Sequence, residues 1–190
     1  MYCPNCGKNL APNAKFCTNC GLQVNETTSN GEKIIMAFMV SKKDGLFKFA
    51  TYSLVFTNTR IIMAYVDDKT LQQASQDAIE TAKANGAGFF KRIGVASNAT
   101  SNYHQRYFSM NPNNILNETS RNFQVYYNDI RSLKVVKGRT DYDADGTSRD
   151  RPGEVIIKTN NDKHTFIMLK TNNDSKIKKE MRNLLPIKVR

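Results

Sequence analysis

Four cysteines lie within the first 20 residues of this chain, and the other 170 residues contain none. They form two Cys-x-x-Cys pairs, and a glycine follows the second cysteine of each pair, where it allows a positive φ. Each turn brings two thiolates to one side of a tight loop. Together the two turns offer the closed tetrahedral ligand set of one structural zinc ion: Cys3, Cys6, Cys17 and Cys20.

This cysteine segment is too short to fold on apolar burial alone. A unit of about 20 residues cannot bury a useful core, so the metal must supply its folding free energy, on the order of 10–16 kcal/mol in small zinc peptides. Four protein ligands also leave no coordination position for water. We therefore expect a structural zinc that performs no catalysis.

Three other uses of the cysteines compete with zinc. Two disulfides would need an oxidising compartment, and residues 1–30 contain no apolar signal segment. A redox Cys-x-x-Cys follows a strand at the start of a helix, whereas no strand precedes Cys3. A rubredoxin-type iron site shares the ligand pattern but needs a longer domain with an aromatic core, and here Tyr2 and Phe16 are the available aromatics. Zinc is the favoured interpretation.

The sequence around the cysteines resembles that of a known family. Residues 2–8 (Tyr-Cys-Pro-Asn-Cys-Gly-Lys) and 14–21 (Ala-Lys-Phe-Cys-Thr-Asn-Cys-Gly) are similar to the short zinc ribbons at the N-termini of many prokaryotic proteins. The resemblance covers residues 1–24. Such ribbons precede many unrelated domains, so the resemblance implies metal binding without specifying a function.

The net charge restricts the class of partner. The chain has 28 Lys+Arg against 17 Asp+Glu, a formal charge of +11, which becomes about +9 when four thiolates bind one zinc. This favours an anionic partner: nucleic acid, an anionic membrane face or an acidic protein. No apolar run approaches the roughly 20 residues of a membrane span. We expect a cytoplasmic protein that can lie at the periphery of a membrane.

The pattern of apolar residues predicts three further regions after the ribbon. Residues 25–31 are small and polar, as in a flexible linker. Residues 32–186 form the main domain, and 187–190 form a basic tail. Strands are predicted at 33–40, 46–56, 60–66, 123–127, 130–136, 154–159 and 164–169. A helical insertion is predicted at 67–119, with helices near 71–82 and 111–118, and an amphipathic helix at 177–185 ends the domain.

This order predicts a mainly β chain with α elements, of class α+β. The main domain should be an antiparallel barrel or sandwich whose open end is closed by the C-terminal helix. Three segments, 55–62, 126–133 and 155–166, resemble the prokaryotic version of the pleckstrin-homology-like fold. The insertion at 67–119 departs from that family's compact pattern.

Two groups of cations are candidates for an anionic surface. The resemblance implies that the first hairpin loop, predicted at 41–45, can bind anionic headgroups; its candidates are Lys42, Lys43 and nearby Lys48. A solvated turn is the simpler interpretation, and we favour it. In the insertion, Lys91 and Arg92 adjoin three apolar residues: Phe89, Phe90 and Ile93. These could enter a membrane interface or anchor the insertion onto the sheet; we favour the anchor, because exposed Phe pairs are uncommon.

The remaining motifs argue against catalysis. Asp141, Asp143 and Asp145 begin like a calcium loop, but Pro152 occupies the place of the bidentate glutamate, so we predict an acidic hairpin loop. His104 and His164 have no cysteine or carboxylate pair beside them in sequence, and no nucleophile elbow or phosphate-binding glycine loop occurs.

We therefore expect a non-catalytic adaptor that binds a protein or an anionic membrane surface, with no small-molecule substrate evident. The alternative is a nucleic-acid-binding protein that uses the basic ribbon, which carries Lys8 and Lys15 and has no acidic residue before Glu26.

Overall fold

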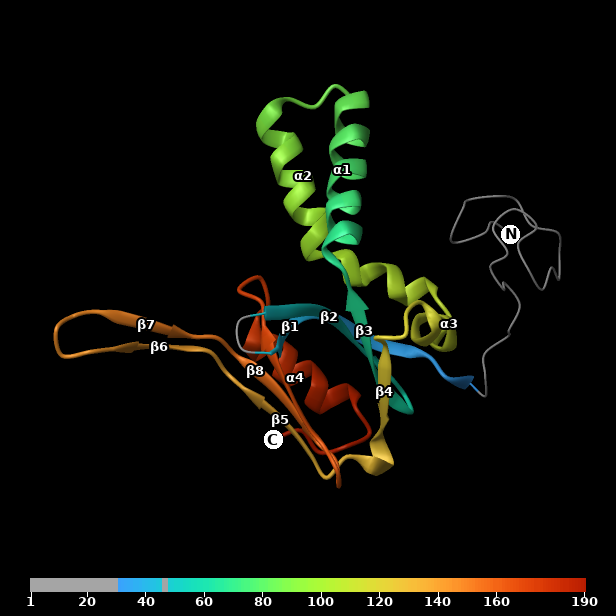
Figure 1. The fold of residues 1–190 in the computed structure, drawn as a ribbon, viewed down its shortest axis with the longest axis vertical. Coiled ribbons are helices and arrows are strands. Elements are labelled where there is room, and N and C mark those ends of the chain that lie inside the picture. Colours follow the sequence, from blue (N-terminus) through green and yellow to red (C-terminus); the bar gives the residue numbers. More distant parts are fainter. Residues whose placement is uncertain (1–30, 46–47) are drawn as a thin grey trace.

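The computed structural model describes residues 31–45 and 48–190 of the chain (Figure 1). The predicted zinc ribbon, its four cysteine ligands and nearly all of the predicted linker lie outside the described residues. The elements below therefore belong to the main domain. They confirm the α+β class.

The centre of the domain is an antiparallel sheet of seven strands in the order β4-β3-β2-β1-β9-β8-β5. The strands are β1 (Ile34–Asp44), β2 (Lys48–Thr57), β3 (Arg60–Val66), β4 (Phe123–Tyr126), β5 (Ser132–Val136), β8 (Glu154–Lys158) and β9 (Lys163–Met168). Among the described residues the two edge strands, β4 and β5, do not pair with each other. The sheet is therefore open, and of the two predicted architectures, barrel or sandwich, it does not form a closed barrel.

The sheet bends at β1, which connects its two halves. This strand pairs with β2 along nearly its whole length, but its register with β9 covers only Val40 and Ser41. A register shift between Ile34 and Met36 adds a further irregularity. The two halves can therefore curve around one core, to which β1, β2, β3, β4, β5, β8 and β9 all contribute buried side chains.

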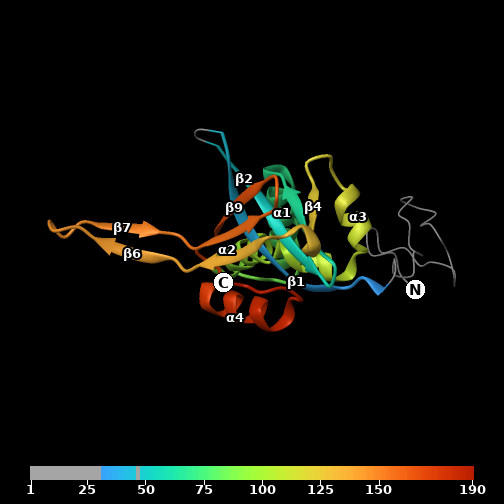
Figure 2. The same cartoon turned by 90° about the horizontal axis from the view of Figure 1, so that it is seen from below.

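A C-terminal helix, α4 (Asp174–Leu184), covers the inner face of the curved sheet (Figure 2). Ile177, Met181 and Leu185 are its contribution to the core. Leu184, which also lies in the predicted amphipathic helix at 177–185, is exposed. The predicted basic tail continues from this helix: Val189 is buried and bridges in parallel to Leu133 on β5.

The outer face of the sheet carries a second, smaller core. Val55, Ile62 and Ala64 point to this side of β2 and β3 and pack against Tyr107 and Ile115 from the insertion. Tyr107 lies in η2 (Tyr103–Ser109) and Ile115 in α3 (Pro112–Asn117). These two short helices attach the insertion to the sheet.

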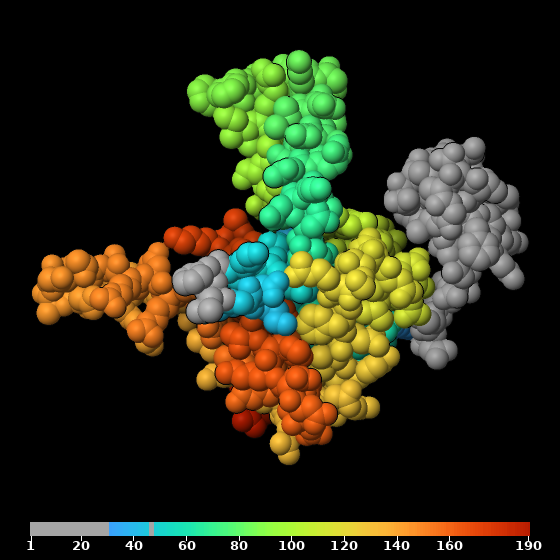
Figure 3. All heavy atoms as spheres, in the orientation of Figure 1, coloured from blue at the N-terminus to red at the C-terminus, as the bar shows by residue number. Residues whose placement is uncertain are grey.

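The rest of the insertion is a pair of helices that stands away from the sheet (Figure 3). They are α1 (Asp68–Ala84) and α2 (Phe89–Ser101), and neither contains a buried residue. The side chain of Asp67 caps α1 by accepting from Thr70 N at 2.8 Å. The second of these helices, α2, was not among the helices predicted within the insertion.

Two short strands, β6 (Arg139–Tyr142) and β7 (Ser148–Arg151), form a separate hairpin that extends from the body (Figures 1 and 2). The turn between them closes with Asp143 N donating to Thr147 O at 2.8 Å, and Gly146 there has φ +82°. The sequence predicted a loop at this place but not the paired strands.

A buried ion pair fixes the start of the main domain. Arg60 Nη2 and Nε donate to the two carboxylate oxygens of Glu32 at 2.7 and 2.8 Å. The hydroxyls of Thr57 and Thr59 donate to the same carboxylate at 2.7 and 2.8 Å. Arg60 Nη2 also donates to Asn113 Oδ1 at 2.6 Å. This network ties the first residues of the domain to the β2–β3 turn and to α3.

Within the described residues, no helix combines the length and the apolar character needed to cross a bilayer.

Candidate functional site

The five cations that the sequence proposed for an anionic surface lie in two separate places, as the two predicted groups. β1 continues to Asp44, so Lys42 and Lys43 are strand residues that pair with Ala50 and Phe49, and the predicted loop at 41–45 is wrong. Side chains of successive strand residues point to opposite faces of a sheet. Lys42 and Lys43 therefore cannot present their charges to one flat surface.

Lys42 is occupied within the domain. Its Nζ lies 5.1 Å from the ring centroid of Phe123 and 5.9 Å from that of Phe166. Such cation–π contacts hold the ammonium over the aromatic rings at the rim of the inner core. Of the three cations predicted in or near the loop, Lys43 and Lys48 remain exposed. Two lysines alone would bind an anionic surface only weakly.

His164 belongs to the same aromatic cluster. Its ring centroid lies 5.1 Å from that of Phe123 and 6.5 Å from that of Phe166. Burial, assisted by the charge of Lys42 and opposed by Asp162, lowers the pKa of His164. His164 is therefore a packing residue of β9.

We expect this histidine to make the domain less stable in mild acid. Its folded-state pKa lies below the ordinary value of 6.5, so the unfolded chain binds a proton first, and stability present above pH 6.5 is lost as the pH falls. His164→Phe should therefore reduce the loss of stability between pH 7.5 and 5. Part of the loss should remain in this variant, because burial also lowers the pKa of His104. Urea unfolding at several pH values measures the effect; identical pH slopes for both proteins would contradict it.

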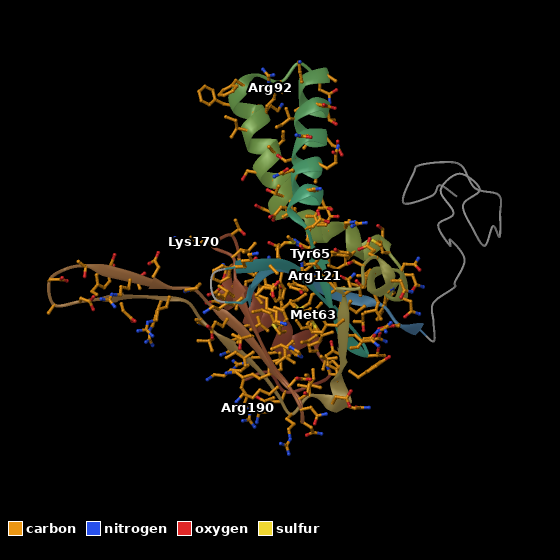
Figure 4. The ribbon with its side chains drawn as sticks, in the orientation of Figure 1. Met63, Tyr65, Arg92, Arg121, Lys170 and Arg190 are labelled. Atoms are coloured by element: carbon orange, nitrogen blue, oxygen red, sulfur yellow. The ribbon has the colours of Figure 1, made fainter. Side chains whose placement is uncertain are left out.

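A charge-assisted contact that the sequence did not reveal lies at the same rim (Figure 4). The guanidinium of Arg121 is 3.6 Å from the ring centroid of Tyr65, and its Nη2 is 2.9 Å from Asp44 Oδ2. The residues come from three distant segments, so no local pattern could have shown it. Both charged groups are exposed, and the contact is a surface feature that braces the β1–β2 hairpin.

The other two predicted cations, Lys91 and Arg92, lie at the far end of the helical hairpin, where Figure 4 labels Arg92. The three apolar residues beside them are exposed: Phe89 by 65%, Phe90 by 86% and Ile93 by 53%. The expectation that they anchor the insertion to the sheet is therefore wrong. Tyr107 and Ile115 provide that anchor, and the apolar end of the hairpin has no partner among the described residues.

The local sequence explains this exposed end, which we call the hairpin tip (residues 85–93). Asn85 caps the C-terminus of α1, and Gly86 adopts φ +73°, which reverses the chain direction. Gly88 is the N-cap of α2, so Phe89 and Phe90 occupy its first turn. Their rings meet edge to face with centroids 5.7 Å apart. The two rings thus form a small apolar cap at the end of a projection.

The acidic residues of the β6–β7 hairpin do not converge. Asp141 forms ion pairs with Arg139 at 2.8 Å and with Arg151 at 2.5 Å, and Asp143 pairs with Arg149 at 3.1 Å. Asp145 accepts instead from the hydroxyl and the backbone N–H of the turn residue Thr147. The Thr147 hydroxyl also donates to Asp143 at 3.3 Å, so all three carboxylates are bonded within the hairpin, in agreement with the predicted acidic hairpin loop.

A groove of about 960 Å³ runs between β1, α2, η2 and α4. Its ionisable lining residues are His104, Lys176 and Glu180, and the last two form an ion pair at 3.8 Å. The groove thus contains no pair of carboxylates that could act as acid and base. Across the part of the chain that the structure describes, no group of three or more His, Cys, Asp or Glu side chains could hold a metal ion.

The comparisons with known proteins concern mainly the N-terminal segment. Residues 2–24 match the family model of the zinc-ribbon domain. This confirms the predicted ribbon and supports zinc binding there, because the matched segment contains all four cysteines and their thiolates suit a tetrahedral zinc. The assignment of those cysteines as ligands of one ion stays a prediction. The search of curated proteins gave no match.

One solved structure is similar to this chain at a large distance. It is described as the hSac2 domain from human phosphoinositide phosphatase Sac2, with a TM-score of 0.40 and 8% sequence identity. The similarity covers 86% of this chain and 80% of that chain. At this TM-score it carries no argument about fold or function.

Proposed function

We propose that this protein is a non-catalytic adaptor that attaches to a membrane surface through the hairpin tip. In this proposal the tip enters the lipid interface with Phe89, Phe90 and Ile93, while Lys91 contacts anionic headgroups. The N-terminal ribbon, held by one structural zinc on Cys3, Cys6, Cys17 and Cys20, is then free to bind a protein partner. We also propose the pleckstrin-homology-like assignment for residues 32–186, supported by the run of antiparallel strands followed by a helix that packs into the core.

The exposure of the two phenylalanines is the observation that carries this proposal. Phe89 and Phe90 are 65% and 86% exposed at the end of a projection, although a protein in water gains by burying such rings. The neighbouring residues 85–88 are small or uncharged, so no bulky group shields the rings. Lys83 in the last turn of α1 and Lys91 in the first turn of α2 place cations beside them. Aromatic residues flanked by lysines are typical of interfacial anchors.

The expected strength is that of a reversible attachment. Complete burial of a Phe side chain contributes about 1.5–3 kcal/mol, so the two partly exposed rings together supply about 2–4 kcal/mol. Each cation near an anionic leaflet adds about 1 kcal/mol. The sum suits a peripheral protein that associates and dissociates, and it depends on both the apolar and the charged parts of the tip.

Sedimentation with lipid vesicles tests the proposal. We expect wild type to bind vesicles of phosphatidylcholine with phosphatidylserine more strongly than phosphatidylcholine alone. The double variant Phe89→Ala/Phe90→Ala should bind on the order of 100-fold more weakly, since about 1.4 kcal/mol corresponds to a factor of ten. Tyr142→Ala is the matched control: this ring is 76% exposed at the end of the other projection, and its removal should change vesicle binding less than twofold.

Two outcomes would count against lipid attachment. Equal vesicle binding by wild type and the double variant would show that the tip does not insert. A concentration-dependent dimer in analytical ultracentrifugation that the same double variant abolishes, without any vesicle binding by wild type, would show that the tip joins two copies of the chain. Both exposed substitutions should leave thermal unfolding nearly unchanged.

A further inference from the structure

Most of the excess positive charge of the chain belongs to the C-terminal elements of the main domain. Residues 131–138 and 152–190 together contain 12 Lys+Arg and four Asp+Glu, an excess of eight out of the net +11 of the whole chain. The helical hairpin from 68 to 101, by contrast, contains four Lys+Arg and three Asp+Glu. The charge that the composition showed is therefore a property of β5, β8, β9, α4 and the C-terminus, and not of the hairpin tip.

Five of these cations surround the outer edge of the sheet at β5, and we call them the basic edge: Lys134, Lys137, Lys178, Arg182 and Arg190. Lys178 Nζ donates to Val135 O at 2.9 Å, which holds α4 against the strand. Arg182 Nε donates to Val189 O at 3.2 Å. The backbone of Arg190 pairs with β5 on both sides, donating to Leu133 O and accepting from Val135 N at 2.9 Å each.

The cations of the basic edge are not neutralised within the described part of the chain. None of the five forms an ion pair there. Two carboxylates, Glu154 and Asp174, lie on neighbouring segments, but neither pairs with one of these cations. Asp174 accepts from Gly138 N at 2.8 Å, and Glu154 lies opposite Val136 in the register of β5 and β8. Burial, together with the charges of Arg182, Lys137 and Lys134, lowers the pKa of Lys178. The cations therefore repel one another, and a bound polyanion would relieve this repulsion.

A second group of cations extends the charge across the outer face of the sheet. Lys158 and Lys163 lie directly opposite each other in the register of β8 and β9. Like charges in this position are destabilising in an antiparallel pair unless an anion lies between them. Lys134 is on the same face as Lys158, two residues along the neighbouring strand from its partner Ser132.

The position and chemistry of the basic edge select among anionic partners. Figure 4 shows Arg190 and Arg92 toward opposite ends of the long axis of the molecule, so a flat membrane in contact with the hairpin tip could not also contact the basic edge. The segments that carry these cations, residues 132–137 and 174–190, contain no aromatic residue on which single-stranded bases could stack. A protein partner would require an apolar interface core, and the edge offers cations instead.

From this arrangement we infer that the basic edge binds the phosphate backbone of double-stranded nucleic acid, without reading its sequence. Lysine and arginine contacts to phosphates release counterions, so the affinity should fall steeply with salt. The inference does not depend on the lipid attachment proposed above. It also differs from the alternative considered for the sequence, because the cations belong to the main domain and not to the ribbon.

The salt dependence of duplex binding by the full chain tests this inference. Fluorescence anisotropy with labelled DNA and RNA duplexes of unrelated sequence, between 50 and 200 mM salt, gives the slope of log affinity against log salt. Lys134→Gln/Lys137→Gln/Arg190→Gln should make the slope for DNA shallower by about 2.7, since each phosphate contact contributes about 0.9. These side chains are exposed and Arg190 pairs through its backbone, so the variant should fold; matched thermal unfolding verifies this.

A control variant that loses the same charge elsewhere distinguishes phosphate binding at the basic edge from nonspecific attraction by the net charge of the protein. Lys69→Gln/Lys83→Gln/Lys91→Gln removes three cations from the helical hairpin, and it should leave the slope within about 0.5 of wild type. Equal weakening by both triple variants, or no duplex binding by wild type at 50 mM salt, would overturn the inference. Loss of vesicle binding in the basic-edge variant with unchanged duplex binding would also overturn it, and would assign the edge to lipid.

Discussion

Replacing Arg60 by alanine is expected to lower the free energy of unfolding by about 3–5 kcal/mol. The guanidinium and the carboxylate of Glu32 are almost fully buried, with side chains 6% and 8% exposed. Removing one of them leaves the other as an uncompensated buried charge. Arg60 Nη2 also bonds to Asn113, so the loss would loosen the attachment of α3. Urea unfolding followed by circular dichroism measures the difference.

An exposed ion pair is the control for this result. Arg121→Ala removes the contact with Asp44, in which both groups are exposed, and it should cost less than about 1 kcal/mol. The double variant Glu32→Ala/Arg60→Ala should lose less stability than the sum of the two single variants, because the second substitution removes the charge that the first left unpaired. Additive effects would show that the two side chains do not stabilise each other.

The Glu32–Arg60 pair should also make the stability of the domain depend on pH in acid. Burial raises the pKa of Glu32, but the hydrogen bonds from Arg60, Thr57 and Thr59 outweigh it, and the net pKa lies below its ordinary value of 4.5. The stability that this carboxylate contributes is therefore complete above pH 4.5 and lost as the pH falls through the folded-state pKa. The loss from Glu32 begins below pH 4.5, whereas that from His164 begins below pH 6.5, so unfolding measured between pH 7.5 and 5 reports on the histidine.

Replacing Cys17 by serine is expected to abolish stoichiometric zinc binding while the main domain stays folded. With three thiolates the ribbon loses its closed ligand set, and with it most of the binding free energy that folds a segment of this size, on the order of 10–16 kcal/mol. The main domain has its own beginning in the Glu32–Arg60 pair and its own core from β1 to α4. Metal analysis should fall from one zinc per chain toward zero.

Thr18→Ser is the matched control, because it changes the same turn without touching a ligand, and it should retain one zinc. The thermal transition of the main domain should be the same in wild type, Cys17→Ser and Thr18→Ser. A large decrease of that transition in the cysteine variant alone would show that ribbon and main domain fold as one unit. Zinc retained by Cys17→Ser would refute the four-cysteine ligand set.

Much of the secondary structure was readable from local pattern. The strand from 60 to 66 has the predicted bounds, and helices lie where they were expected near 71–82 and 111–118. These features depend on residues near one another in sequence, such as a cap, a fixed proline φ or an apolar repeat. Their physical causes are local, so the sequence shows them.

The apolar segment of the insertion was misassigned because local pattern does not say what covers it. Phe89, Phe90 and Ile93 have the composition of a core anchor, yet they are exposed, while Tyr107 is 1% exposed on the outer face of the sheet. The difference arises from the length of α1 and α2, which carries the tip away before η2 returns the chain to β2 and β3. Burial is a property of the whole packing arrangement.

The amino-acid sequence by itself determined the zinc ribbon, the α+β class and the excess of positive charge, because ligand spacing, apolar period and composition are all contained in the order of residues. The tertiary structure alone decided where the charge collects and which apolar residues remain exposed. Lys134 and Arg182 are 48 residues apart in the sequence and belong to one edge only because α4 packs against β5. Pairing of distant strands and helices creates these surfaces, and local propensity does not encode it.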